Sequence, residues 1–195
     1  MSNGTLSPRD RLLETASRLF YSEGIHSVGV DRLVREAGVT LATFYRHFPT
    51  KEALVEAYLR ATDQRLRGNV ENALRDREPR QALEALLDLI GQRTSAPGYR
   101  GCQFINAAAE YPDNAHPVHV AVNDHRTWFR EIATEVAREI GHPDPSEAGQ
   151  FLVVLHDGAL VAAELDDQRA VQAAVKHAAL QLLDPHAGGA GAQGK

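Results

Sequence analysis

The sequence has little of several features that mark large classes of protein. Among its 195 residues there is one cysteine, Cys102, which excludes an intramolecular disulfide framework and favours a reducing compartment. The longest uninterrupted apolar blocks, such as 151–155, are far too short to cross a bilayer. No basic run leads into an apolar one at the N-terminus, as it would in a secretory signal. These absences predict a cytoplasmic protein with no membrane partner.

Motifs of catalysis are also missing. The sequence has no GxSxG, no glycine-rich phosphate loop and no Cys/His pair at a spacing that suggests a nucleophile. Its carboxylates are plentiful, but they fall on predicted helix faces where solvation explains them. We therefore expect neither an enzyme nor a bound cofactor. An enzyme built on the C-terminal helices stays an alternative, which turnover of a bound compound would support.

Helical periodicity is present almost throughout. Hydrophobic residues make up 43% of the chain and charged residues 24%, which disfavours the disordered and fibrous classes. Apolar residues recur at helical spacing, and no segment alternates as a strand does. Proline, glycine and capping residues divide the pattern into about nine helices of an all-α fold. The predicted helices cover about 8–23, 30–37, 40–47, 51–74, 79–93, 102–110, 117–140, 148–165 and 168–183.

Charge is unevenly distributed along the chain. The net charge is −5, yet residues 1–51 hold seven Arg or Lys residues and five acids, a balance of +2, which leaves −7 for the rest. An anionic partner is therefore tolerated at the N-terminal end and repelled by the remainder.

Residues 30–48 have the layout of a helix-turn-helix, in which two short helices are joined by a tight turn at Gly38. The inner face of the second helix carries Phe44 and Phe48. Its outer face carries residues that can reach DNA, and Lys51 follows at the start of the next helix. The predicted DNA-binding residues are Thr40, Leu41, Ala42, Thr43, Tyr45, Arg46, His47 and Lys51.

A longer stretch around this motif resembles a known family. The segments are RDRLLETASRLFYSEGIHSVGVDRLV and EAGVTLATFYRHFPTKEALVEAYL, about 60 residues together. They closely resemble the N-terminal signature of the tetracycline-repressor (TetR) family of bacterial transcription regulators, with core, turn, recognition and linker positions in one register. The resemblance implies a homodimer whose N-terminal three-helix domains bind a palindromic operator and whose C-terminal helices bind a small effector.

That resemblance sets the expected domains and roles. We expect a DNA-binding domain over 1–50, a ligand-binding and dimerisation domain over 51–184, and a disordered tail over 185–195. Family members most often act as repressors, although activators also occur. Positions 43, 45, 47 and 51 match residues that family members place mainly on operator phosphates, and positions 41 and 42 match residues that face the bases.

The sequence departs from the family pattern at three positions of the predicted DNA-binding domain. Leu41 stands where a polar or basic residue is usual and can make only apolar contact, most naturally with a thymine methyl group. Val28 and Gly29 stand where Thr or Ser is frequent. These departures keep open an alternative function, that of a helical small-molecule-binding or interaction protein without operator binding.

Two further sets of residues are predicted in the C-terminal helices. Aromatic residues at helical spacing are usually core, but the resemblance makes some of them candidates for a pocket that takes a largely hydrophobic effector. The candidate ligand-binding residues are Phe104, Asn106, Glu110, His125, Trp128 and Phe129. A helix that is apolar on nearly every side needs covering on both faces, which a dimer partner would supply. The candidate interface residues are Phe151, Leu155, Ala159, Ala163, Ala170, Ala174 and His177.

Histidines raise two other possibilities. His116, His119 and His125 suggest a metal site, but no Cys or carboxylate completes a recognised ligand spacing, so solvated or capping roles are favoured and no metal is expected. His156 and Asp157 interrupt an apolar helix. They could line a pocket, bridge the dimer or be satisfied by neighbours, and the last reading is slightly favoured.

Overall fold

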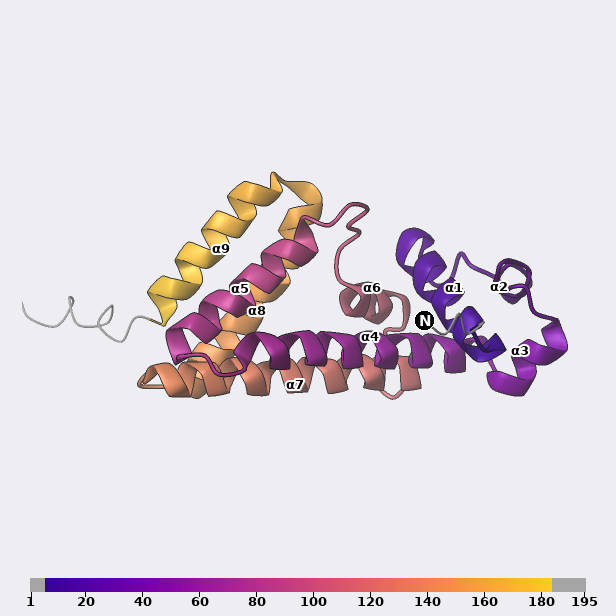
Figure 1. Cartoon of the computed structure of the whole chain (residues 1–195), viewed down its shortest axis with the longest axis horizontal. Helices are drawn as coiled ribbons and strands as arrows, with labels where there is room; N and C mark the ends of the chain where they lie inside the picture. Colours follow the sequence, from indigo (N-terminus) through magenta and orange to yellow (C-terminus); the bar gives the residue numbers. More distant parts are fainter. Residues whose placement is uncertain (1–5, 184–195) are drawn as a thin grey trace, which may run out of the picture. The chain divides into compact units, whose positions relative to one another are not determined.

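A computed structural model describes residues 6–183, and over this range the chain forms nine α-helices and no strand (Figure 1). The all-α prediction is confirmed. The helices are α1 Pro8–Glu23, α2 Val30–Ala37, α3 Leu41–His47, α4 Lys51–Leu74, α5 Pro79–Thr94, α6 Gln103–Glu110, α7 Pro117–Ile140, α8 Pro145–Leu165 and α9 Gln168–Leu182.

Side-chain caps begin several of these helices where the sequence predicts them. The Ser7 hydroxyl accepts a hydrogen bond from the backbone N–H of Asp10 at 3.2 Å, and the Asp144 carboxylate accepts one from Glu147 at 3.0 Å. Each cap satisfies an N–H group that the first helical turn leaves without an internal partner. The cap at Asp144 starts α8 three residues earlier than the apolar periodicity alone indicates.

The chain divides into two compact units. The first contains residues up to 65 together with 102–124, and the second contains 66–101 together with the residues from 125 onward. Helices α4 and α7 each contribute residues to both units. The functional boundary expected after residue 50 stays a prediction, and the expected tail over 185–195 lies outside the described residues.

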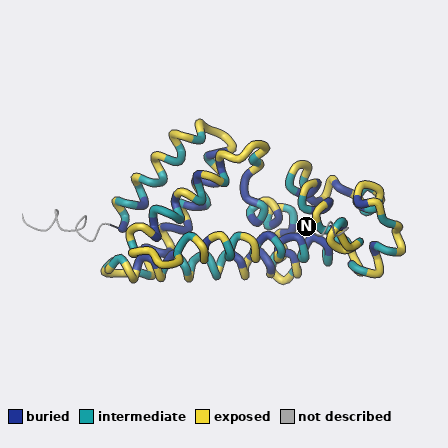
Figure 2. The backbone as a smooth tube through the Cα atoms, viewed as in Figure 1, coloured by how far each residue is buried: buried dark blue, intermediate teal, exposed yellow. Residues whose placement is uncertain are grey.

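In the first unit, α1, α2 and α3 pack against one another. Their contact surface is apolar: Leu12, Leu19, Leu33 and Phe44 are fully buried. Figure 2 shows buried segments alternating with exposed turns along these helices, as expected when each helix presents one apolar stripe to a shared core.

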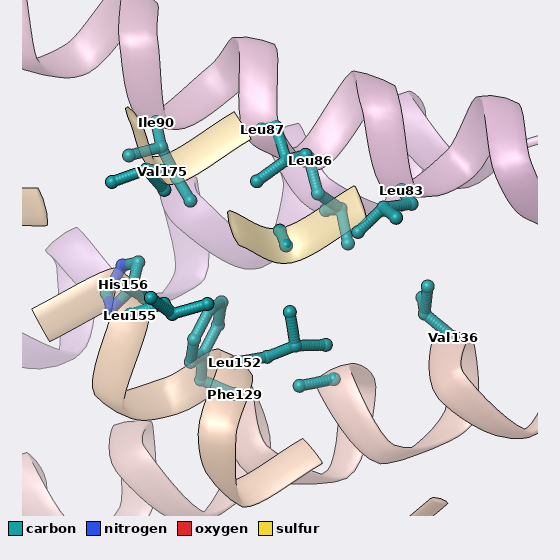
Figure 3. Close-up of a pocket in the computed structure, with 12 residues that line it drawn as sticks. Leu83, Leu86, Leu87, Ile90, Phe129, Val136, Leu152, Leu155, His156 and Val175 are labelled. Carbon is teal, nitrogen blue, oxygen red and sulfur yellow. The ribbon is translucent and has the colours of Figure 1, made fainter. Parts of the chain in front are cut away.

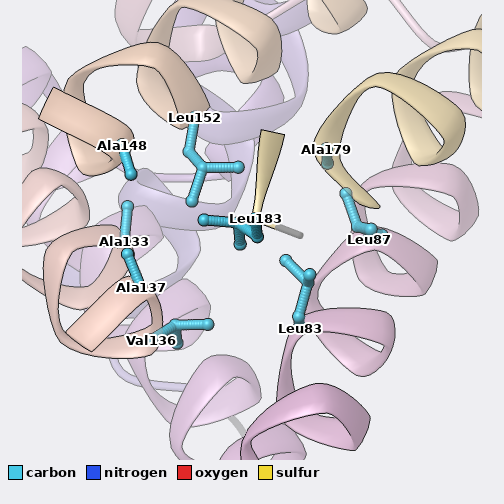
Figure 4. Packing of buried hydrophobic residues seen from close by; sticks show 9 residues of the cluster. All are labelled: Leu83, Leu87, Ala133, Val136, Ala137, Ala148, Leu152, Ala179 and Leu183. Atoms are coloured by element: carbon cyan, nitrogen blue, oxygen red, sulfur yellow. The ribbon is translucent and has the colours of Figure 1, made fainter. Parts of the chain in front are cut away.

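In the second unit, α5, α8 and α9 pack mutually, and α7 adds to the same core. Figure 4 shows the buried cluster, which consists of Leu83, Leu87, Ala133, Val136, Ala137, Ala148, Leu152, Ala179 and Leu183. Helices α7 and α8 approach closely at Gly149, where an added Cβ would lie 2.9 Å from the backbone of Thr134. Only glycine fits this contact without displacing the helix backbone.

Helix α8 is long and apolar enough to cross a membrane by length and composition. In this structure it instead packs against α5 and α9, and eight of its residues are buried, so it is the central helix of a packed core. One side stays uncovered within the subunit. The exposed apolar residues there are Phe151, Val154, Val161 and Leu165.

Candidate functional site

The turn between α2 and α3 is held by both backbone and side-chain hydrogen bonds. Gly38 adopts the left-handed conformation at φ 63° and ψ 41°, and the N–H of Val39 donates to the carbonyl of Val34 at 3.0 Å. From α1, the Arg11 guanidinium donates to the carbonyls of Ala37 at 3.0 Å and Gly38 at 3.3 Å. Arg11 therefore ties the turn to the first helix and limits how far α3 can pivot.

Helix α3 has a buried side and an exposed side. The Thr40 hydroxyl caps it by accepting from the N–H of Thr43 at 3.1 Å. Phe44 is fully buried and Phe48 nearly so, and their ring centroids lie 6.2 Å apart. The exposed side carries Leu41 (45% exposed) and Tyr45 (51% exposed) one turn apart.

The remaining predicted DNA-binding residues flank this exposed pair. Ala42 and Arg46 are exposed one turn apart, and His47 is half-buried. Within the described residues, the Nε2 atom of His47 is buried and has no hydrogen-bond partner. The Lys51 ammonium donates to the carbonyl of Ile25 at 2.7 Å, and burial lowers its pKa from the usual value, although Glu52 and Glu110 oppose that shift.

Two arginines, Arg18 on α1 and Arg32 on α2, are paired with carboxylates. Arg32 forms ion pairs with Glu23 and, at 2.9 Å, with Glu36, and the hydrogen bonds that it donates to these two carboxylates raise its pKa. Arg18 contacts Glu36 at 2.6 Å. Arg46, in contrast, is an exposed cation on α3.

Glu110, at the end of α6, holds the turn between α1 and α2. Its carboxylate accepts hydrogen bonds from the backbone N–H groups of Ile25 at 2.8 Å and His26 at 2.6 Å. It also lies 3.1 Å from Nδ1 of His26, whose ring stacks on Tyr111 with centroids 5.0 Å apart. Lys51 donates to the carbonyl of Ile25, so α4 holds residue 25 and α6 holds residues 25 and 26.

The six predicted ligand-binding residues do not share one compact unit. Phe104, Asn106 and Glu110 belong to the first unit, and His125, Trp128 and Phe129 belong to the second. Trp128 packs between His125 and Phe129, and the Arg67 guanidinium lies 4.7 Å above its ring. Of the six, Phe129 also lines an apolar cavity in the second unit (Figure 3).

The predicted interface residues divide between the interior and the surface of the subunit. Ala159 and Ala163 are buried inside the subunit, and Leu155 lines the cavity. Phe151 is exposed, as are three residues of α9, namely Ala170, Ala174 and His177.

The other singled-out histidines have local partners. Nδ1 of His116 accepts from the N–H of Val118 at 3.2 Å, which caps the start of α7, and Nδ1 of His119 lies 2.7 Å from the carbonyl of Tyr111. His156 is buried, lines the cavity and lies 3.3 Å from the carboxylate of Asp157.

Two residues hold distant backbone groups, and the sequence around each of them gives no indication of this role. Arg11 reaches backbone 26 and 27 residues away, and Glu110 reaches backbone 84 and 85 residues away. Helical periodicity describes the face on which such a residue lies but not its distant partner, so a fold is needed to find these contacts.

Known proteins are similar to this chain in sequence, and one of those described next is also similar in structure. The family model for bacterial regulatory proteins of the tetR family matches residues 12–58. A TetR-family transcriptional regulator from Streptomyces coelicolor, SCO4454, has a crystal structure that is 45% identical, with 92% of this chain and 96% of that chain covered and a TM-score of 0.88. The transcriptional activator FasR of Mycolicibacterium smegmatis is 35% identical over 60% of this chain and 57% of its own length. The transcriptional repressor KstR2 of Rhodococcus jostii is 27% identical over 69% of this chain and 62% of its own length.

Proposed function

Because the chain belongs to the TetR family of bacterial transcriptional regulators, we propose that it binds a palindromic DNA operator as a homodimer, represses transcription there and is released by a small effector. The family consists of regulators, in agreement with the expectation that the chain is not an enzyme. Relatives named as an activator and as a repressor both occur, so transcription from a promoter carrying the operator is the direct test of repression.

The observation that carries the DNA-binding proposal is the two-sided character of α3. A recognition helix needs a buried face that fixes its angle and an exposed face that enters the major groove. Here Phe44 is buried, whereas Leu41 and Tyr45 are about half exposed. In this proposal Leu41 and Ala42 approach the bases. The residues that position the helix on the DNA phosphate backbone are Thr40, Thr43, Tyr45, Arg46, His47 and Lys51.

Leu41 makes the proposal specific. An isobutyl group has no hydrogen-bonding atom, so it favours a base pair that presents a thymine methyl group in the major groove. Operators selected from random DNA by the wild-type protein should contain an A·T pair at that position. In Leu41→Ala the preference there should fall by about 1 kcal/mol, while Val120→Ala, at an exposed valine on α7, should leave it unchanged. An unaltered site preference in Leu41→Ala removes Leu41 from the base-reading set.

Phosphate contacts should act on all sequences alike. Tyr45→Phe removes only a hydroxyl and should weaken binding to selected and random DNA by similar factors. Affinity should fall steeply with salt, since binding releases counterions from the DNA. Binding that is insensitive to salt would contradict the placement of α3 on the phosphate backbone.

The uncovered side of α8 supports the dimer. Phe151, Val154, Val161 and Leu165 recur at spacings of three, four and seven, which places them on one stripe of the helix. Ala170, Ala174 and His177 of α9 are exposed as well, and the two alanines are small enough to allow close approach. In this proposal the α8 contribution is the exposed stripe rather than Ala159 and Ala163, which the subunit covers itself.

A charge on the stripe tests the dimer without disturbing the fold. Asp at position 161 is solvated in a monomer, because Val161 is 47% exposed, but would be buried unpaired in a dimer. Val161→Asp should sediment as a folded monomer and lose operator affinity. Val120→Asp, at a valine that is 40% exposed on α7, is the matched control and should stay dimeric. A dimeric Val161→Asp protein places the interface elsewhere.

Helix α4 is the proposed route from effector to DNA. It begins at Lys51, which binds the turn between α1 and α2, and continues without a break to Leu74 in the second unit. An effector shifts operator affinity only if it binds the two arrangements unequally. An effector that binds stoichiometrically and leaves operator affinity unchanged would refute this coupling.

A further inference from the structure

The arginines of α1, α2 and α3 fall into two groups according to what they contact. One group binds backbone carbonyls or carboxylates of the same unit, and its members are Arg11, Arg18 and Arg32. The other group is exposed and, within residues 6–183, forms no ion pair or hydrogen bond. Its members are Arg9, Arg35 and Arg46. The second group is therefore the one that can bind an external anion without first breaking a contact inside the subunit.

Arg9 differs from the other two exposed arginines because an aromatic ring holds it in place. Its guanidinium lies over the ring of Phe48, 5.4 Å from the ring centroid. The negative face of an aromatic ring attracts a guanidinium, and a stacked guanidinium keeps its N–H groups available at its edges. One turn along α1 from Arg9, positions 12 and 13 are leucines, so no carboxylate stands there at ion-pair spacing. The adjacent carboxylate, that of Asp10, accepts a hydrogen bond from the Ser7 hydroxyl at 2.6 Å.

The stacked guanidinium lies at the C-terminal end of α3. Phe48 is the residue that ends this helix, and its backbone N–H donates to the carbonyl of Phe44 at 2.8 Å. Leu41, Tyr45 and Phe48 are four and three residues apart, so they follow one another along one side of α3. The side that carries the exposed Leu41 and Tyr45 therefore continues to the ring on which Arg9 stacks. Helices α1 and α3 pack against each other, and Figure 1 shows the indigo start of α1 beside α3.

We propose that Arg9 is a further DNA-binding residue, and that its guanidinium donates hydrogen bonds to a backbone phosphate at the edge of the major groove. This inference rests on the proposed function, since it requires α3 in the groove with Leu41 toward the bases. Phe48 lies seven residues beyond Leu41, which is about 10 Å along the helix axis. Because the groove is about 12 Å wide, a cation at that distance from the bases reaches the phosphates that border it. A planar guanidinium matches a phosphate with two parallel N–H groups.

The salt dependence of DNA affinity tests this contact on the full-length protein. Affinities for a selected operator and for random DNA of equal length are measured by fluorescence anisotropy between about 50 and 200 mM salt. Each phosphate contact adds about 0.9 to the slope of log affinity against log salt, so Arg9→Gln should lower the slope of a dimer by about 1.8. The affinity advantage of the wild type should then be about tenfold smaller at the higher salt concentration. The effect should be the same on both DNAs, because phosphates carry no sequence information.

Two further variants separate the phosphate contact from other effects of charge. Arg9→Lys keeps the charge and should keep the wild-type slope, but it should bind both DNAs less tightly because an ammonium makes no bidentate contact. Arg18→Gln is the matched control, since it removes the same charge from the same helix. Arg18 is paired with Glu36 and lies nine residues from Arg9, on the opposite side of α1, so this variant should keep the wild-type slope and affinity.

Each other result overturns the assignment in its own way. Equal slopes in Arg9→Gln and Arg18→Gln, with DNA binding by the wild type intact, reject the Arg9 contact alone. A weaker Arg9→Gln protein with the wild-type slope shows that Arg9 only holds α3 through the ring of Phe48. A loss confined to the selected operator assigns Arg9 to base reading instead of phosphate binding. A wild type that binds neither DNA rejects the proposed function and this contact with it.

Discussion

Replacement of Glu110 should loosen the turn between α1 and α2 and weaken operator binding. The carboxylate accepts two backbone N–H groups, at 2.8 and 2.6 Å, and hydrogen bonds to a charged group contribute about 1.5–3 kcal/mol each. The side chain of Glu110 is 23% exposed, so water recovers part of this in Glu110→Ala. The ion pair with His26 adds little, because His26 is 61% exposed. We expect a net local loss of about 2 kcal/mol.

Hydrogen exchange measures this loss at the bonds themselves. A local loss of about 2 kcal/mol should accelerate exchange of the Ile25 and His26 amides by about 30-fold, with α8 amides unaffected. Glu110→Gln keeps one acceptor oxygen and should show about half the effect in kcal/mol. Glu131→Ala, at an exposed glutamate on α7, is the control.

Operator affinity provides the functional measurement. Residues 25 and 26 precede α2, so a loosened turn should let the α2 and α3 pair sample orientations that do not fit the groove, and affinity should drop in Glu110→Ala. Unchanged exchange at both amides, or operator binding equal to that of Glu131→Ala, would refute the argument that Glu110 positions this turn.

Three further outcomes are expected. The unfolding free energy should fall as pH drops below about 6.5, since His156 has a lowered pKa in the folded state and the unfolded chain takes up the proton first. The slope for this group is at most about 1.4 kcal/mol per pH unit, and in urea titrations His156→Phe should remove that part of the pH dependence. Gly149→Ala should cost about 1–3 kcal/mol by forcing α8 away from Thr134, whereas Gly68→Ala, where an added Cβ has open space, should stabilise α4 by about 0.5–1 kcal/mol; a stabilised Gly149→Ala protein would contradict the close approach. Thr40→Ala should cost about 1 kcal/mol by removing the cap of α3, and an unfolding midpoint equal to wild type would count against that cap.

The helices and the buried and exposed sides of α3 could be predicted from the sequence for local reasons. The local signals are caps such as Ser7 and Asp144, the glycine at position 38 and the apolar periodicity. They act within one or two helical turns, so they can be recognised in short segments of sequence. The same holds for α3, where Phe44 is buried and its neighbour in sequence, Tyr45, is about half exposed. The expected identity of the recognition residues came from resemblance to the family rather than from spacing.

Only the tertiary structure decided which side of α8 is covered. The helix is apolar on nearly every side, so periodicity does not distinguish a stripe at Ala159 and Ala163 from one at Val154 and Val161. Packing against α5 and α9 buries Ala159 and Ala163, whereas Val154 and Val161 stay exposed. The partners of Glu110 were also decided by the tertiary structure, because the local sequence pattern does not indicate a hydrogen bond between residues 85 positions apart. Sequence alone therefore determined the elements and their local ends, which depend on short-range interactions. The fold decided their partners, because long-range contacts arise from how the elements pack.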